Sequence, residues 1–143
     1  RRVTLDAEAA PLVGAVMRQV NSGFDYQAVG GLTLGADPVA SAMMHNAAGE
    51  GELLNSFVVR KSEKQHGLQR RIEGPDVSGV RVLAVEDTST TGSSVMTAVE
   101  ALLVDGAVIA GVSVIVDRGA RAAVEERGYE YTAAYSLEDL GLE

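Results

Sequence analysis

The segment formed by residues 82–94 constrains the fold more than any other part of the chain. Four apolar residues precede the acids Glu86 and Asp87, and a stretch rich in serine and threonine follows, with Gly92 inside it. The apolar run predicts a buried strand, and the polar stretch is typical of a turn that begins a helix. The start of a helix presents unpaired N–H groups and the positive end of the helix dipole, which attract anions. We therefore predict a strand–turn–helix unit that binds a phosphate group.

The rest of the chain alternates between helical and strand patterns. Apolar residues at helical spacing predict helices over residues 6–20, 37–48, 93–104 and 121–127, with a last helical turn over 137–140. Apolar runs predict strands over residues 26–29, 56–59, 80–85, 107–116 and 130–134. This alternation indicates an α/β fold, a parallel β-sheet flanked by helices on both faces. The length of 143 residues fits one domain over residues 1–143.

The polar stretch after the two acids offers hydroxyl groups and backbone N–H groups to a phosphate. Its members are Thr88, Ser89, Thr90, Thr91, Gly92, Ser93 and Ser94. Because like charges repel, the two acids do not suit the phosphate, whereas carboxylates accept hydrogen bonds from vicinal hydroxyls such as those of a ribose. The alternative is an N-capped helix without a ligand. The segment has neither the glycine–lysine pattern of a P-loop nor the glycine pattern of a dinucleotide site.

Charge is distributed unevenly along the chain. The net charge is −8, yet residues 60–71 hold five cations and one acid. The acidic remainder argues against a nucleic-acid-binding surface, and the basic island indicates a local site for a small, highly anionic ligand. We expect no membrane span and no secretory signal. The absence of cysteine excludes disulfides and thiolate metal sites, and it suits a cytoplasmic protein.

The basic segment has the pattern Arg-Lys-x-x-Lys-x-His-Gly and follows the strand predicted over residues 56–59. We expect a long exposed loop that can fold over a diphosphate, neutralise the charge that grows as pyrophosphate leaves, and exclude water. The alternative is a charged loop that contacts only solvent. Its candidate site residues are Arg60, Lys61, Lys64 and His66.

The unit at residues 82–94 resembles the phosphoribosyl diphosphate (PRPP) signature of the type I phosphoribosyltransferases. Ser89 departs from it, since the family commonly has an aliphatic residue there. The resemblance implies that Glu86 and Asp87 bind the ribose of PRPP and that the polar stretch binds its 5′-phosphate. It also implies a Mg²⁺ ion carried by the PRPP oxygens, with no metal site built from side chains.

The basic pattern is similar to the catalytic loop of the orotate phosphoribosyltransferases. In that family the loop reaches into the active site of the neighbouring subunit. The resemblance therefore implies a homodimer with a shared loop whose four candidate residues contact the diphosphate. The catalytic residues that it implies are Lys64, His66 and Asp87, with Lys64 the main loop residue that stabilises the transition state.

Arg118 follows the strand predicted over residues 107–116. An arginine at the end of a strand can hold a carboxylate through two parallel hydrogen bonds. The alternative is a salt bridge to Asp117 or Asp87. The resemblance implies that Arg118 and Thr90 bind orotate, which carries such a carboxylate.

Two further features differ from the usual family pattern. Residues 30–35 resemble the family's pyrophosphate loop, but Leu34 stands where many orotate enzymes have a lysine, so contacts there would come from the backbone. Family members also usually begin earlier, with a helix and a hairpin that form a hood over the orotate pocket. We expect that this N-terminal hood is missing from the sequence, either trimmed or absent.

The reaction implied by the resemblance joins orotate to the ribose 5-phosphate of PRPP and releases pyrophosphate, giving orotidine 5′-monophosphate in pyrimidine biosynthesis. Two alternatives remain open. One is a phosphoribosyltransferase for a purine base. The other is a non-catalytic, PRPP-sensing regulator that binds nucleic acid, against which the acidic remainder of the chain speaks.

Overall fold

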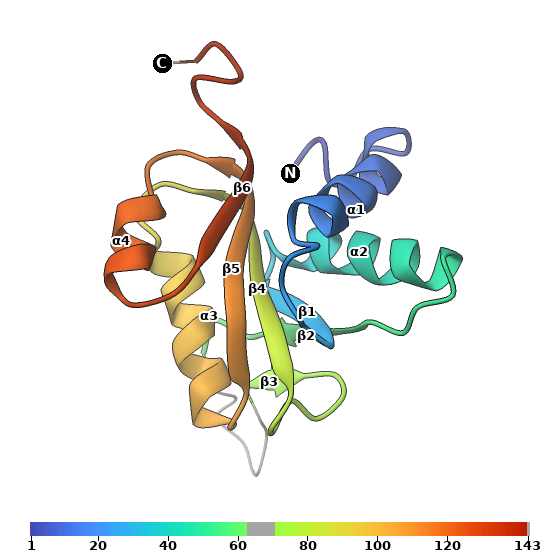
Figure 1. Cartoon of the computed structure of the whole chain (residues 1–143), viewed down its shortest axis with the longest axis vertical. Helices are drawn as coiled ribbons and strands as arrows, with labels where there is room; N and C mark the ends of the chain where they lie inside the picture. Colours follow the sequence, from blue (N-terminus) through green and yellow to red (C-terminus); the bar gives the residue numbers. More distant parts are fainter. Residues whose placement is uncertain (63–70, 143) are drawn as a thin grey trace.

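A six-stranded sheet in the order β3-β2-β1-β4-β5-β6 forms the centre of the fold (Figure 1). The computed structural model describes residues 1–62 and 71–142. Its strands are β1 (Ala28–Leu32), β2 (Asn55–Val59), β3 (Ile72–Glu73), β4 (Arg81–Ser89), β5 (Val108–Asp117) and β6 (Tyr131–Ser136). Its helices are α1 (Ala9–Val20), α2 (Asp37–Gly49), α3 (Ser93–Val104) and α4 (Arg121–Glu126). Neighbouring strands are parallel except for β2 and β3, which are antiparallel.

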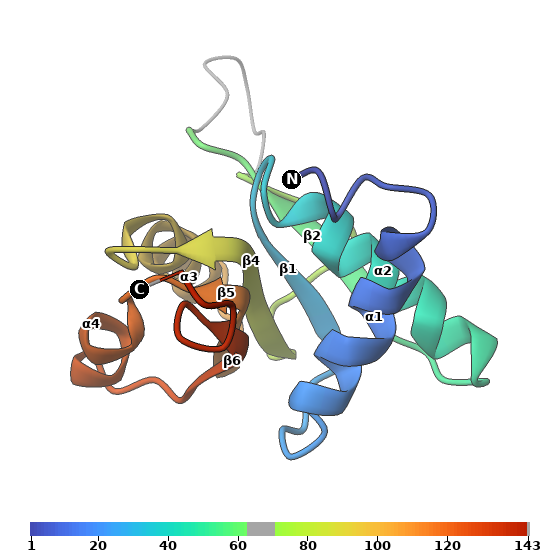
Figure 2. The same ribbon diagram turned by 90° about the horizontal axis from the view of Figure 1, so that it is seen from above.

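Helices cover both faces of the sheet. Helices α1 and α2 lie on one face, and α3 and α4 lie on the other (Figures 1 and 2). Strand β4 is buried between them, because Leu83 and Val85 pack with α1 and α2 while Val82 and Ala84 pack with α3 and α4. The predicted parallel sheet with helices on both faces is therefore confirmed.

Several element boundaries differ from the prediction by a few residues; β1, for example, runs over Ala28–Leu32 rather than residues 26–29. Helix α1 begins at Ala9 rather than at residue 6, because the Asp6 carboxylate accepts the N–H groups of Glu8 and Ala9, both at 3.0 Å. Strand β4 extends to Ser89, where it still pairs with β5. The loop predicted after β2 includes β3, whose Ile72 pairs with Val59 and is buried.

A buried polar cluster fixes α1 on the sheet. Asn21, directly after α1, donates from Nδ2 to Oγ of Ser113 on β5 at 2.8 Å, and Thr132 on β6 donates to Oδ1 of Asn21 at 2.6 Å. Asn21 and Ser113 are fully buried. Because buried polar groups are costly unless they are paired, this cluster favours one placement of the helix.

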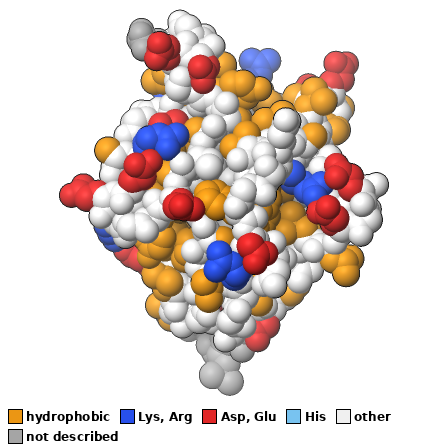
Figure 3. Space-filling model, viewed as in Figure 1, with side chains coloured by type: hydrophobic (Ala, Val, Ile, Leu, Met, Phe, Trp, Pro, Cys, Tyr) orange, Lys and Arg blue, Asp and Glu red, His pale blue; other side chains and the backbone are white. Residues whose placement is uncertain are grey.

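The surface carries both signs of charge. On the face drawn in Figure 3, acidic and basic side chains lie in scattered groups with hydrophobic side chains between them. This face shows no continuous basic surface. In the described part of the chain, no helix is long and apolar enough to cross a membrane.

The carboxyl edge of the sheet brings distant segments together. Because β1, β2, β4 and β5 run parallel, the segments that follow them all leave from the same edge. These are residues 33–36 after β1, Arg60 after β2, residues 90–92 after β4 and Arg118 after β5. This edge is where an α/β sheet of this kind binds its ligands.

Candidate functional site

Two adjacent acids lie where β4 reaches the carboxyl edge. Glu86 is 7% exposed, and its Oε1 accepts the N–H of Asp87 at 3.0 Å. Asp87 accepts the N–H of Thr88 at 2.7 Å. Gly35, in the connection from β1 to α2, packs so closely that a Cβ there would lie 2.1 Å from Oε1 of Glu86. The acids are therefore held between their own strand and the β1–α2 connection.

The environment of Glu86 favours its neutral form. Burial, and then the hydrogen bond and charge of Asp87, raise the pKa of Glu86 from 4.5 to about 8. The Asp87 N–H and the charge of Arg1 act in the opposite direction, with a smaller total effect. Near neutral pH the Glu86 side chain is therefore mostly protonated. In the free protein, this lowers the repulsion between the two adjacent carboxyl groups.

The polar stretch after the acids forms the predicted turn into a helix. Gly92 has a φ of 83°, which favours glycine, and α3 begins at the next residue. The hydroxyl of Thr91 accepts the N–H of Ser93 at 3.2 Å. The candidate residues with exposed side chains are Thr88, Thr90, Thr91, Ser93 and Ser94. Ser89 is 7% exposed, so its hydroxyl is the least available of the set.

Arg118 lies beside this turn. Its N–H donates to the carbonyl of Ser89 at 2.8 Å, which joins the end of β5 to the end of β4. Its side chain is exposed, and no acid among residues 1–62 and 71–142 lies within ion-pair distance of it. The alternative salt bridge to Asp117 or Asp87 is not formed. The guanidinium is therefore available to an anionic ligand at the same edge as the acids.

The base of the basic segment is held by β3. Arg60 pairs with Glu73, and Arg71 donates from Nε to the carbonyl of Arg60 at 2.8 Å. Lys61 is exposed. The two predicted catalytic residues of this segment, Lys64 and His66, lie outside the described residues. The structure therefore places the start of the basic segment at the carboxyl edge of the sheet.

The glycine-rich residues 30–35 span the end of β1 and the start of its connection to α2. A Cβ on Gly31 would lie 2.2 Å from the carbonyl oxygen of Val85, so glycine is needed for β1 to approach β4 this closely. The peptide bond between Thr33 and Leu34 is cis, and Leu34 is exposed. The structure thus gives these glycines a packing role, and a backbone contact to a diphosphate remains a prediction.

Known proteins resemble the chain over its whole length. No protein-family model matches it. The orotate phosphoribosyltransferase of Streptomyces avermitilis is 57% identical over 146 residues, which cover 100% of this chain and 80% of that protein. The enzyme of the same name from Corynebacterium glutamicum is 53% identical over 144 residues, with 99% and 77% covered. The chain belongs to the orotate phosphoribosyltransferase family.

Solved structures agree with this membership of the orotate phosphoribosyltransferase family. The Mycobacterium tuberculosis orotate phosphoribosyltransferase in complex with PRPP matches with a TM-score of 0.89 and 49% identity, covering 99% of this chain and 81% of that chain. A phosphoribosyltransferase from Corynebacterium diphtheriae matches with a TM-score of 0.90 and 53% identity, covering 99% and 83%. The resemblance noted from residues 60–67 and 82–94 is confirmed. The roles assigned to individual residues stay predictions.

One contact at the candidate site was not predicted from the sequence. The hydroxyl of Tyr131, at the start of β6, donates to Oδ1 of Asp117 at 3.1 Å, next to Arg118. The two residues lie 14 positions apart in the sequence. No sequence pattern marks such a pair, because the sheet and α4 create the contact.

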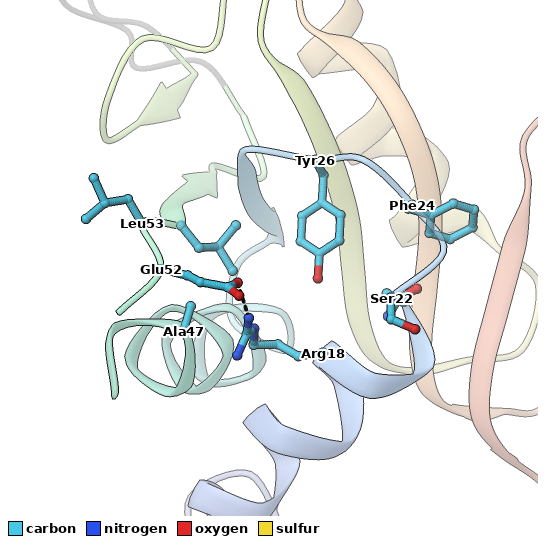
Figure 4. A pocket seen from close by; sticks show the side chains of 9 residues that line it. Arg18, Ser22, Phe24, Tyr26, Ala47, Glu52 and Leu53 are labelled. Carbon is cyan, nitrogen blue, oxygen red and sulfur yellow. Dashed lines mark hydrogen bonds and ion pairs between the residues drawn. The ribbon is translucent and has the colours of Figure 1, made fainter. Parts of the chain in front are cut away.

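A separate pocket lies at the amino edge of the sheet (Figure 4). Tyr26 precedes β1, Leu53 precedes β2, and Arg18 from α1 pairs with Glu52 across the opening. The cavity has a volume of about 290 Å³. It opens at the end of the strands opposite to the acids, so it is not part of the candidate site.

Proposed function

We propose that the chain transfers the ribose 5-phosphate group of PRPP to orotate, giving orotidine 5′-monophosphate and pyrophosphate. The observation that carries the proposal is one edge of the sheet that holds the acid pair, the hydroxyl-rich start of α3 and Arg118, which has no acid partner among the described residues. These groups suit the ribose hydroxyls, the 5′-phosphate and the orotate carboxylate in turn. The names of the relatives, and the PRPP bound to the M. tuberculosis enzyme, support the assignment.

Each part of the site has one task in this proposal. Glu86 and Asp87 accept hydrogen bonds from the ribose hydroxyls. The N–H groups at the start of α3, with the hydroxyls of residues 88–94, hold the 5′-phosphate. Thr90 and Arg118 hold orotate so that its nitrogen faces the anomeric carbon. Catalysis then comes from positioning and from stabilisation of the charge that develops as the ribose gains oxocarbenium character.

The leaving diphosphate is assigned to the basic segment. We infer that Arg60, Lys61, Lys64 and His66 contact it, and that Lys64 and His66 act with Asp87 in catalysis. The segment leaves from the same edge as the acid pair, because β2 is parallel to β1 and β4. We further propose a homodimer in which the segment of one subunit serves the site of its partner.

A magnesium ion fits this site as a companion of the substrate. Among the residues that the structure describes, no group of three or more His, Cys, Asp or Glu side chains could hold a metal. Mg²⁺ bound to PRPP oxygens and water would neutralise diphosphate charge without a protein cage.

The proposed setting is a single phosphoribosyltransferase domain over residues 1–143 in the cytoplasm, without nucleic-acid or membrane partners. The net charge of −8 and the mixed charges in Figure 3 speak against the alternative of a nucleic-acid-binding regulator. The guanidinium of Arg118, which no described acid pairs with, favours a base that carries a carboxylate over a purine.

The test is an assay of pyrophosphate release from PRPP with Mg²⁺ and one base at a time. We expect release with orotate and none above background with adenine or hypoxanthine. Turnover of a purine base with none of orotate would contradict the proposal and favour the first alternative. PRPP-dependent binding of DNA or RNA, without turnover of any base, would favour the second.

A further inference from the structure

One carboxylate oxygen organises the turn that carries Arg118. Asp117 is the last residue of β5, and its Oδ1 accepts three hydrogen bonds. Two come from the backbone N–H groups of Gly119 and Ala120, both at 2.9 Å, and the third comes from the hydroxyl of Tyr131 at 3.1 Å. The Asp117 side chain, which precedes Arg118, is thus bonded to the backbone of the two residues that follow Arg118.

The backbone of Arg118 is therefore fixed from several directions. Its own N–H donates to the carbonyl of Ser89 at 2.8 Å, and Gly119 has a φ of 117°. The side chain of Arg118 itself is exposed. A guanidinium that holds a carboxylate by two parallel hydrogen bonds must be presented in one orientation. Here the turn fixes the point from which the side chain leaves the backbone, and no described acid pairs with the guanidinium.

Tyr131 is itself held in place. It is 5% exposed, the guanidinium of Arg121 lies 5.0 Å from the centre of its ring, and Arg121 donates to its carbonyl at 3.0 Å. Burial, and then the charge and hydrogen bond of Asp117, raise the pKa of Tyr131. The hydroxyl therefore remains protonated and able to donate to Asp117.

We propose that Tyr131 and Asp117 are positioning residues for Arg118, and that through it they set the affinity for the carboxylate of the acceptor base. The inference rests on the proposed function, because it takes Arg118 as the group that binds orotate. Neither residue needs to touch a substrate. The network acts on the acceptor and leaves the PRPP part of the site unchanged.

The first test is Tyr131→Phe, which removes one hydrogen bond and little else. We expect the KM for orotate to rise roughly fivefold to tenfold, the usual effect of one lost hydrogen bond, with the KM for PRPP unchanged. The matched control is Tyr129→Phe, because Tyr129 packs partly buried against the same core and its hydroxyl has no hydrogen-bond partner in the described residues. The control is expected to match the wild type.

A double-mutant cycle with Arg118→Ala separates positioning from a general structural effect. If Tyr131 acts through Arg118, adding Tyr131→Phe to Arg118→Ala causes no further rise in the KM for orotate. Asp117→Asn, which keeps an acceptor oxygen, is expected to retain more orotate affinity than Asp117→Ala. Should Asp117→Ala fail to fold, the Tyr131 cycle still decides the matter.

The outcomes distinguish the inference from the proposed function. No turnover of orotate by the wild type, or an unchanged KM for orotate in Arg118→Ala, would overturn the assignment of Arg118 and the inference with it. A raised KM in Arg118→Ala but not in Tyr131→Phe would overturn the inference alone. So would equal changes in the KM values for PRPP and orotate, or additive effects in the cycle.

Discussion

Glu86 and Asp87 are neighbours in the sequence with different environments. Glu86 is buried and its pKa is raised to about 8, whereas the side chain of Asp87 is 16% exposed. In the proposed site both accept hydrogen bonds from ribose hydroxyls, and an ionised carboxylate does this best. Binding of PRPP then favours the ionised form of Glu86, which must give up its proton.

PRPP affinity is therefore expected to depend on the protonation of Glu86. Because the free protein holds the proton below about pH 8, the Kd for PRPP should fall as the pH rises toward 8, by at most about tenfold per pH unit. Calorimetric titrations in buffers of different ionisation enthalpy would measure the Kd and the proton released. Glu86→Gln is the control, since PRPP's own phosphates titrate equally with both proteins. An identical pH dependence in the variant would exclude Glu86 as the source.

Among the elements, β1 and β4 approach each other through a position that admits only glycine. A Cβ on Gly31 would meet the Val85 carbonyl oxygen at 2.2 Å and the Ala36 Cβ at 2.8 Å, and neither is the flexible end of a side chain. Gly31→Ala should therefore lower the free energy of unfolding by about 3 kcal/mol, measured by urea denaturation.

Gly49→Ala is the matched control for that change. Gly49 ends α2, and a Cβ there would meet no atom within 4 Å. Its stability should stay within about 0.5 kcal/mol of the wild type or rise slightly, since alanine favours a helix. Equal losses of stability in the two variants would show that the loss of glycine, rather than the close approach of the strands, matters.

How far the elements could be predicted depends on whether their limits are set locally. Helix α3 begins and ends as predicted, with Gly92 before it and Gly106 soon after it, both at positive φ. Strand β4 runs beyond its apolar residues because β5 pairs with Thr88 and Ser89, and nothing in that polar segment reveals a partner strand. Strand β3 has two residues, too few for any periodicity.

The same distinction applies to the candidate site. The acids, the hydroxyls and Arg118 were found because each follows an apolar strand directly in the sequence. The contact between Tyr131 and Asp117, and that between Gly35 and Glu86, join separate elements. Only the folded sheet brings those residues together, so local patterns could not predict them.

At the scale of the whole molecule, one strand lies between the base of the basic segment and the acid pair. Arg60 directly follows β2, Glu86 and Asp87 lie on β4, and β1 runs between β2 and β4. The pair of Arg60 with Glu73 fixes the base of the segment at its own side of the sheet. A segment anchored there can serve its own site or the site of a second subunit, and the proposal assigns it to the second.

Mixed dimers test that assignment. Lys64→Ala alone should lower kcat far more than PRPP affinity, because its contact strengthens as charge develops on the leaving group, and Asp87→Asn alone should be nearly inactive. If the segment is shared, each mixed dimer contains one intact site. Equal amounts of the two chains, after subunit exchange, should then recover about a quarter of wild-type activity. Capture through two different tags would verify that mixed dimers form. If those dimers stay as inactive as the parent variants, each basic segment serves its own subunit.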